Sequence, residues 1–212
     1  MRTPIAKSWP IVHPVRMQGS SAGDSRETLQ TPVLTDGDVV LRVATERDAD
    51  AMTAGLADFE TARWLISVPH PYPHEDSLAW ICEVVPTGWQ SGKQLWFVVA
   101  DATTDQFLGE IGLRDVDRSA AMAEVGYWLA PAARGRGAAR RALQLLVAWS
   151  FDDLGIERLD WAAMADNWAS RAVAEAVGFR FEGVRRSRAF RISDATRHDE
   201  CVMGLVRGDL SL

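Results

Sequence analysis

Two arginines alternate with two glycines near the middle of the chain, at Arg134, Gly135, Arg136 and Gly137. An apolar run rich in strand-forming residues precedes them, and a long amphipathic segment follows, so their backbone amides gather at the start of a helix. The unpaired amides and the dipole of a helix start attract anions. Glycines let the backbone approach a bulky group, and arginines pair with phosphate oxygens. The turn therefore predicts a site for a ligand that carries phosphates.

Two common phosphate-binding turns fit this stretch poorly. A P-loop needs a Gly-Lys-Ser/Thr string, which the chain lacks. A dinucleotide fingerprint needs a third Gly or Ala where Arg140 stands, although Asp160 lies about twenty residues on, where a ribose-binding acid is expected. Asp160 is placed inside the apolar run 159–164 rather than at its end. A nicotinamide-dependent reductase is thus the weaker alternative.

Arg134, Gly137 and Ala139 match the Arg/Gln-x-x-Gly-x-Gly/Ala signature of the GNAT N-acetyltransferases. The Asn-Trp-Ala-Ser string at 167–170, followed by Gly-Phe at 178–179 and Glu-Gly at 182–183, resembles the RimJ/RimL branch. The resemblance covers about residues 34–206. It implies transfer of an acetyl group from acetyl-CoA to an amine acceptor, without a metal, in a family where homodimers are common. A non-catalytic acyl-CoA-binding sensor or interaction module is the alternative that these residues leave open.

The resemblance also assigns the cosubstrate contacts. Pantetheine is expected to pair with the strand that ends at Trp128 and Leu129, and pyrophosphate to lie on the turn. Asn167 would hold pantetheine or orient a water, and Ser170 would donate to the departing thiolate; capping of the next helix by Asn167 is equally compatible. The expected acetyl-CoA contacts are Trp128, Leu129, Arg134, Gly135, Arg136, Gly137, Ala138, Ala139, Asn167 and Ser170.

Two carboxylates are candidates for the base that deprotonates the amine. Glu110 and Glu124 fall on adjacent strand-like runs, each sharing its strand face with a glycine, Gly112 or Gly126. That pattern predicts a concave, accessible surface beside each acid. Glu124 is the first candidate because it lies just upstream of the phosphate turn. At pH 7 an α-amine costs about 1 kcal/mol to neutralise and a lysine about 4.6 kcal/mol, so a carboxylate acting through water suits an α-amine.

Hydrophobic periodicity predicts the elements that position these residues. The fold class expected is α/β (α+β), a mixed, mostly antiparallel sheet of about six or seven strands with helices on both faces. Asp48 is the expected N-cap of the first helix. Strands are expected over 39–43, 94–100, 107–114, 122–129, 158–164, 179–190 and 201–206, and helices over 48–56, 59–65, 75–85, 138–154 and 169–177.

Composition narrows the class of protein. With 212 residues and 47% hydrophobic residues, the chain suits one large domain, expected over 34–212 after a flexible extension at 1–33. A net charge of −6 argues against nucleic acid, because the arginine cluster is confined to one turn. Without a membrane-length apolar run or a signal peptide, we expect a cytoplasmic protein. The only two cysteines, Cys82 and Cys201, are expected in the core.

The histidines add one loop of interest. His70 and His74 have a metal-like spacing, but the prolines between and before them forbid a helix, so a zinc site is not expected. In the resembling family this loop borders the acceptor pocket. His70, Tyr72 and Trp64 are therefore candidates for contact with the acceptor, although a solvated loop explains them as well.

Overall fold

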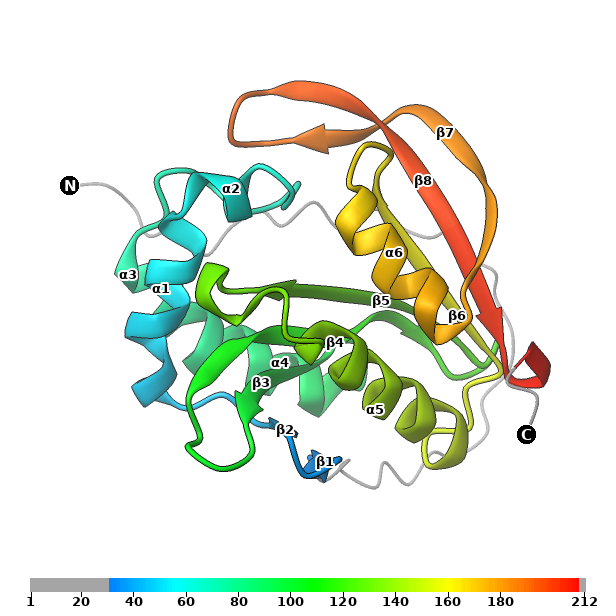
Figure 1. Cartoon of the computed structure of the whole chain (residues 1–212), viewed down its shortest axis with the longest axis horizontal. Coiled ribbons are helices and arrows are strands. Elements are labelled where there is room, and N and C mark those ends of the chain that lie inside the picture. Colours follow the sequence, from blue (N-terminus) through cyan, green and yellow to red (C-terminus); the bar gives the residue numbers. More distant parts are fainter. Residues whose placement is uncertain (1–30, 210–212) are drawn as a thin grey trace.

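The computed structural model describes residues 31–209, so most of the predicted extension lies outside the described residues. Eight strands form one sheet in the order β1-β2-β3-β4-β5-β6-β8-β7 (Figure 1). The seven predicted strands are confirmed, and the eighth is the two-residue β1. The strands are β1 (Leu34–Thr35), β2 (Val39–Arg42), β3 (Leu95–Asp101), β4 (Phe107–Asp117), β5 (Met122–Leu129), β6 (Arg158–Met164), β7 (Arg180–Arg191) and β8 (Thr196–Val206).

Helices cover both faces of this sheet. The helices α5 and α6 lie on one face, and α1 and α3 lie on the other (Figure 1). The buried side chains of α4 join the α5 side of the core, where the Trp89 ring packs on Trp149 with centroids 5.9 Å apart. The helix predicted over 75–85 continues across Pro86 to Ser91, with a π-helical turn over Trp80–Val84 in its middle. The helices are α1 (Ala49–Ala57), α2 (Phe59–Ala62), α3 (His74–Ala79), α4 (Val85–Ser91), α5 (Ala138–Asp152) and α6 (Trp168–Val177).

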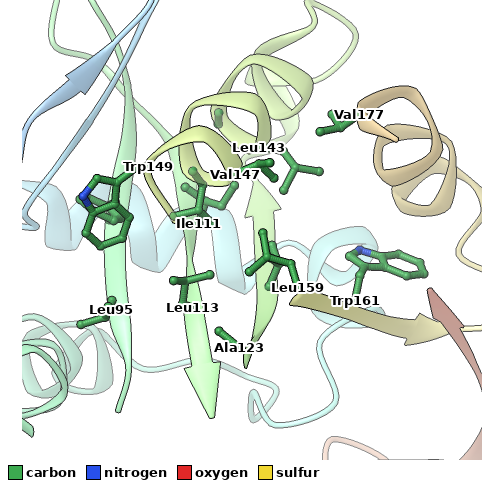
Figure 2. Packing of buried hydrophobic residues seen from close by; sticks show 14 of the residues in the cluster. Leu95, Ile111, Leu113, Ala123, Leu143, Val147, Trp149, Leu159, Trp161 and Val177 are labelled. Atoms are coloured by element: carbon green, nitrogen blue, oxygen red, sulfur yellow. The ribbon is translucent and has the colours of Figure 1, made fainter. Parts of the chain in front are cut away.

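The largest core cluster lies between the sheet and α5. Leu143 and Leu146 recur at helical spacing and are fully buried, as are Ile111 and Leu159 on the sheet. Figure 2 shows Leu143 and Val147 of α5 over Ile111 of β4. This packing fixes the start of α5, and with it the glycine turn, against the end of β5.

Asp48 takes the predicted N-cap position of α1, but its side chain makes no capping hydrogen bond to that helix. Its carboxylate instead accepts hydrogen bonds from the Thr45 amide at 2.8 Å and from Arg42 Nη2 at 2.8 Å, and it is buried. The pair ties the loop before α1 to β2. An Asp at a helix start can satisfy either partner, and the nearby arginine decided between them.

The hairpin of β7 and β8 reaches across the molecule to α2 (Figure 1). Arg191 Nη1 donates to the Arg63 carbonyl at 2.8 Å, and the Ile192 amide donates to the Ile66 carbonyl at 3.0 Å. These bonds connect the tip of the hairpin to the segment that follows α2. The two segments thus form a bridge at one end of the sheet.

Only one of the two cysteines lies in the core. Cys201 on β8 is buried, as predicted, whereas Cys82 is exposed on the π-helical turn, so the core prediction for Cys82 is wrong. The π turn rotates the helix face on which an uninterrupted α-helix would bury that position. Among residues 31–209, no helix has both the length and the apolar content that a membrane crossing requires.

Candidate functional site

The glycine turn has an open surface and left-handed backbone. Gly135 has φ of 74° and Gly137 has φ of 79°, a region that side chains disfavour, and no atom lies within 4 Å of where either Cβ would be. The first backbone hydrogen bond of α5 runs from the Arg141 amide to the Gly137 carbonyl at 3.1 Å. The amides of residues 138–140 precede that bond and face the start of the helix, as an anion site requires.

The arginines around the turn have different surroundings. The Arg134 guanidinium bends back to the Leu129 carbonyl, with Nε at 3.1 Å, and its Nη2 lies 2.5 Å from Thr61 Oγ1. Arg141 is paired with Asp36 at 2.8 Å. Arg136 is exposed beside the open glycines. Arg134 thus connects the end of β5 to α2, whereas Arg136 and Arg140 are exposed at the turn.

The sheet opens beside this turn. β5 and β6 are parallel, and their pairing runs from Met122 with Arg158 to Val125 with Trp161, where it stops. Beyond that point β5 stays paired with β4, and β6 stays paired with β8, so the two strands diverge. The edge of β5 over 126–129 that faces β6 therefore has no strand partner within the described sheet. A peptide-like chain such as pantetheine can pair with such an edge.

Residues from β5 and α6 meet across this opening. The Tyr127 hydroxyl donates to the Ser170 carbonyl at 2.8 Å, and burial raises the pKa of Tyr127 to about 12, so its hydroxyl is protonated at neutral pH. The Asn167 side chain accepts from the Ser170 amide at 3.2 Å, which confirms its predicted capping role. Asn167 and Ser170 thus lie on the rim of the opening.

Both candidate bases lie on one face of the sheet. In the register of β4 with β5, Glu110 is opposite Trp128, Gly112 is opposite Gly126, and Arg114 is opposite Glu124. These six residues point to the face opposite α5, because alternate residues of a strand share a face.

The predicted concave surface is present beside Glu124, which lines a cavity, but it is absent beside Glu110, which is buried, and the space over the two glycines is filled. A Cβ at Gly112 would lie 2.7 Å from the Trp96 ring, and one at Gly126 would lie 3.0 Å from it. The glycines make room for the Trp96 indole, which separates Glu110 from Glu124. The alternation of glycines marked the space for a large ring, but it did not indicate that β3 supplies that ring.

Glu124 faces a hollow in the sheet. Its carboxylate is hydrogen-bonded to Arg114, and it lines a cavity of about 200 Å³ that also presents Asp160 and Glu182. Arg158 also lines the cavity and forms ion pairs with Asp160 and Glu182, each at 2.7 Å. Glu124 is one residue before the last pair of β5 with β6. The structure thus brings it to the closed end of the opening, on the face that bears the hollow.

Glu110 is in a different environment. It is 4% exposed, and its two oxygens accept from Trp80 Nε1 at 2.8 Å and from Trp128 Nε1 at 3.0 Å. Burial raises the pKa of Glu110 to about 7, against the lowering effect of the two indole hydrogen bonds. Sequence reasoning missed Trp80 and Trp96, because the chain has nine tryptophans and nothing in the spacing singled these out.

The histidine loop lies at the rim of the second, smaller core cluster. Tyr72 packs against it, and the His70 ring is exposed, 5.7 Å from the Phe59 ring. Within the described part of the chain, no group of three or more His, Cys, Asp or Glu is arranged to hold a metal ion.

Comparisons with known proteins agree with this geometry. A sequence profile described as the acetyltransferase (GNAT) domain matches residues 38–180. The uncharacterized N-acetyltransferase YoaA of Bacillus subtilis is 25% identical over 83% of this chain and 97% of its own. The structure of Mycobacterium smegmatis RimJ in complex with CoA-disulfide is 26% identical, with a TM-score of 0.73 over 85% of this chain and 88% of that chain. RimL, a ribosomal L7/L12 α-N-protein acetyltransferase in complex with coenzyme A, shares the fold at 19% identity and a TM-score of 0.71, over 82% and 98% of the two chains.

The matched profile spans more than half of the chain and includes the glycine turn, both candidate bases, and Asn167 with Ser170. The chain therefore belongs to the GNAT family of acetyltransferases, enzymes that transfer an acetyl group from acetyl-CoA to an amine.

Proposed function

We propose that acetyl-CoA binds with its pyrophosphate on the amides of residues 135–139 and its pantetheine along the unpaired edge of β5. The turn is open there, and Arg136 is exposed beside it. From the turn, pantetheine would run past Leu129 and Trp128 toward the closed end of the opening. The thioester then reaches the sheet near Gly126, next to Glu124.

Glu124 is the base in this proposal. The amine nitrogen bonds to the thioester carbonyl carbon, the carbon–sulfur bond breaks, and the proton of the amine passes to Glu124 through a water in the hollow. Arg114 holds the carboxylate in place. On the other side of the opening, the Ser170 hydroxyl donates to the departing thiolate, while Asn167 keeps the first turn of α6 in position.

The acceptor that fits best is a protein N-terminal α-amine. Glu124 is ion-paired with Arg114 and partly exposed, so water can reach its carboxylate. A carboxylate that acts through water suffices for an α-amine, because an α-amine is easily neutralised at pH 7. The hollow beside Glu124 is lined by acidic and basic side chains together, with Asp160 and Glu182 paired to Arg158, and so presents polar groups to an entering amine. The observation that carries this proposal is the placement of Glu124 in a hollow at the closed end of the β5–β6 opening.

The test is acetylation of peptides by the purified full-length chain. Peptides with a free α-amine are compared with the same peptides blocked at the N-terminus and carrying a lysine, with thiol release and mass spectrometry as readouts. We expect acetylation of free α-amines. Equal or greater acetylation of the blocked lysine peptides would overturn the acceptor assignment.

The base is tested separately with Glu124→Gln. We expect turnover to fall about a hundredfold, within the range for loss of a general base, while acetyl-CoA still binds. Glu83→Gln changes an exposed carboxylate outside the site and serves as the matched control. A Glu124→Gln enzyme with full activity across pH 6–9 would remove Glu124 as the base.

A further inference from the structure

Glu110 is a buried carboxylate for which the proposed transfer has no direct use. Its two oxygens are occupied by indole donors at 2.8 and 3.0 Å, and it is 4% exposed, so it has no room to approach an amine. Burying a carboxylate between neutral donors costs stability. The indoles do not require it either, since Trp89 elsewhere in the core satisfies its Nε1 with the Trp96 carbonyl at 3.0 Å.

Both donors are fixed in place by unusual local structure. Trp80 begins the π-helical turn that interrupts the helix between α3 and α4. Such turns are frequent at functional sites because they redirect side chains at the cost of regular hydrogen bonding. Trp128 lies against Gly55 of α1, where a Cβ would be 2.7 Å from the ring, and packs on Phe107 with ring centres 5.7 Å apart.

These indoles connect Glu110 to the reacting surface. Trp128 is on β5 itself, within the stretch that faces the opening. Trp80 meets Trp96 edge to face, with centroids 5.6 Å apart, and Trp96 lies over Gly126, two residues from Glu124. Trp80 and Trp96 thus pack as an aromatic pair, and Trp96 in turn covers Gly126. Through these contacts Glu110 helps to position β5 at Trp128 and at Gly126, the two ends of the segment on which thioester and amine would meet.

We propose that Glu110 is a positioning residue, which fixes Trp80 and Trp128 and through them the acceptor side of the β5–β6 opening. The inference rests on the proposed placement of the thioester along β5. It assigns Glu110 a role distinct from that of Glu124: it takes no proton from the amine and touches neither substrate.

The first test examines the two hydrogen bonds that Trp80 and Trp128 donate to Glu110, here called the clamp, and it needs no activity assay. In the ¹⁵N-labelled full-length protein, the indole N–H resonances of Trp80 and Trp128 are followed from pH 5.5 to 8.5. We expect both to shift together, and neither to shift in Glu110→Gln. Asp48 and Tyr72 also act electrostatically on this region. Against the effect of burial, hydrogen bonds from Arg42 and Thr45 lower the pKa of Asp48, and burial raises the pKa of Tyr72, so neither group titrates between pH 5.5 and 8.5. Asp48→Asn is the control that checks this for Asp48. Independent or pH-invariant indole signals in the unaltered protein would overturn the clamp.

The second test reads the consequence for turnover, with acetyl-CoA and the best peptide from the acetylation screen. In Glu110→Gln the amide group faces one indole N–H with another donor, so one bond of the pair is lost. We expect kcat/KM for the peptide to fall about tenfold to a hundredfold. The Kd for acetyl-CoA should change much less, because pantetheine is proposed to pair with the backbone edge of β5 and not with the Trp128 ring. Trp80→Phe should reproduce the loss, and it should not add to that of Glu110→Gln in the double variant.

Trp89→Phe is the matched control, because it also loses one buried indole hydrogen bond, but to a main-chain carbonyl. If Trp89→Phe lowers kcat/KM as much as Trp80→Phe does, or if Glu110→Gln leaves kcat/KM unchanged, the positioning role is refuted. If no peptide is acetylated while the indole resonances still titrate together, the proposed acceptor has failed and the clamp has not.

Discussion

Replacing Glu110 by Gln should change how stability depends on pH. The pKa of Glu110 rises from an ordinary 4.5 to about 7 in the folded chain because the carboxyl is buried. Between these values the unfolded chain has lost the proton and the folded chain still holds it, so the wild type loses stability as pH rises. The full loss, about 2.5 pKa units at about 1.36 kcal/mol each, is about 3 kcal/mol. Gln carries no proton to lose, so the wild type should weaken relative to Glu110→Gln by that amount.

Urea unfolding followed by far-UV circular dichroism, at pH 4.5 and at pH 8, measures this difference. Other carboxylates contribute equally to both proteins and cancel in the comparison. Glu83→Gln, at an exposed position, should show a nearly constant difference from the wild type over the same range. A stability difference between wild type and Glu110→Gln that stays constant, or that grows in favour of the wild type as pH rises, would refute the buried, late-titrating carboxylate.

Three further outcomes are expected. Gly137→Val should weaken acetyl-CoA binding at least tenfold by calorimetry, because the left-handed turn at φ of 79° resists a β-branched residue; unchanged affinity would place the pyrophosphate elsewhere. Leu143→Ala should lower the free energy of unfolding by about 2–5 kcal/mol in urea titrations, since Leu143 is fully buried between α5 and the sheet; a loss below about 1 kcal/mol would contradict that packing. Asn167→Ala should cost about 1 kcal/mol of stability through the lost cap, and Asn167→Asp should recover most of it; equal losses in both would show that capping is not its contribution.

Local patterns were enough to predict most of the elements. The period of apolar residues in α5 and the strand-like runs around Glu110 and Glu124 were confirmed, as was the cap at Asn167. These features depend on neighbours in sequence. The π-helical turn at Trp80 was missed because no local signal distinguishes it from the regular helix that the period predicts.

Contacts between distant segments were harder to foresee. The position of the sheet opening depends on where β5 and β6 stop pairing, and the sequence of neither strand alone predicts that point. The glycines at 112 and 126 favoured an open surface, and no local signal indicated that the ring of Trp96 fills the space above them. Arg134 was predicted to be a phosphate ligand. In the structure its guanidinium donates hydrogen bonds to the Leu129 carbonyl and to Thr61, a residue 73 positions earlier. Such choices among equally good partners are settled by the tertiary fold.

The strand order imposes a sequence of events on folding. β8 lies between β6 and β7, although it follows both along the chain. During synthesis, which proceeds from the N-terminus, β6 and the exposed β7 have no bridging neighbour until residues 196–206 have emerged. The outer edge of β6, with seven residues paired to β8 in the finished sheet, is left open in that interval. A nascent chain stalled before β8 should therefore offer the open hydrogen-bonding edge of β6 to chaperones or to other chains. Once synthesis resumes and β8 emerges, β8 pairs with β6 and covers that edge.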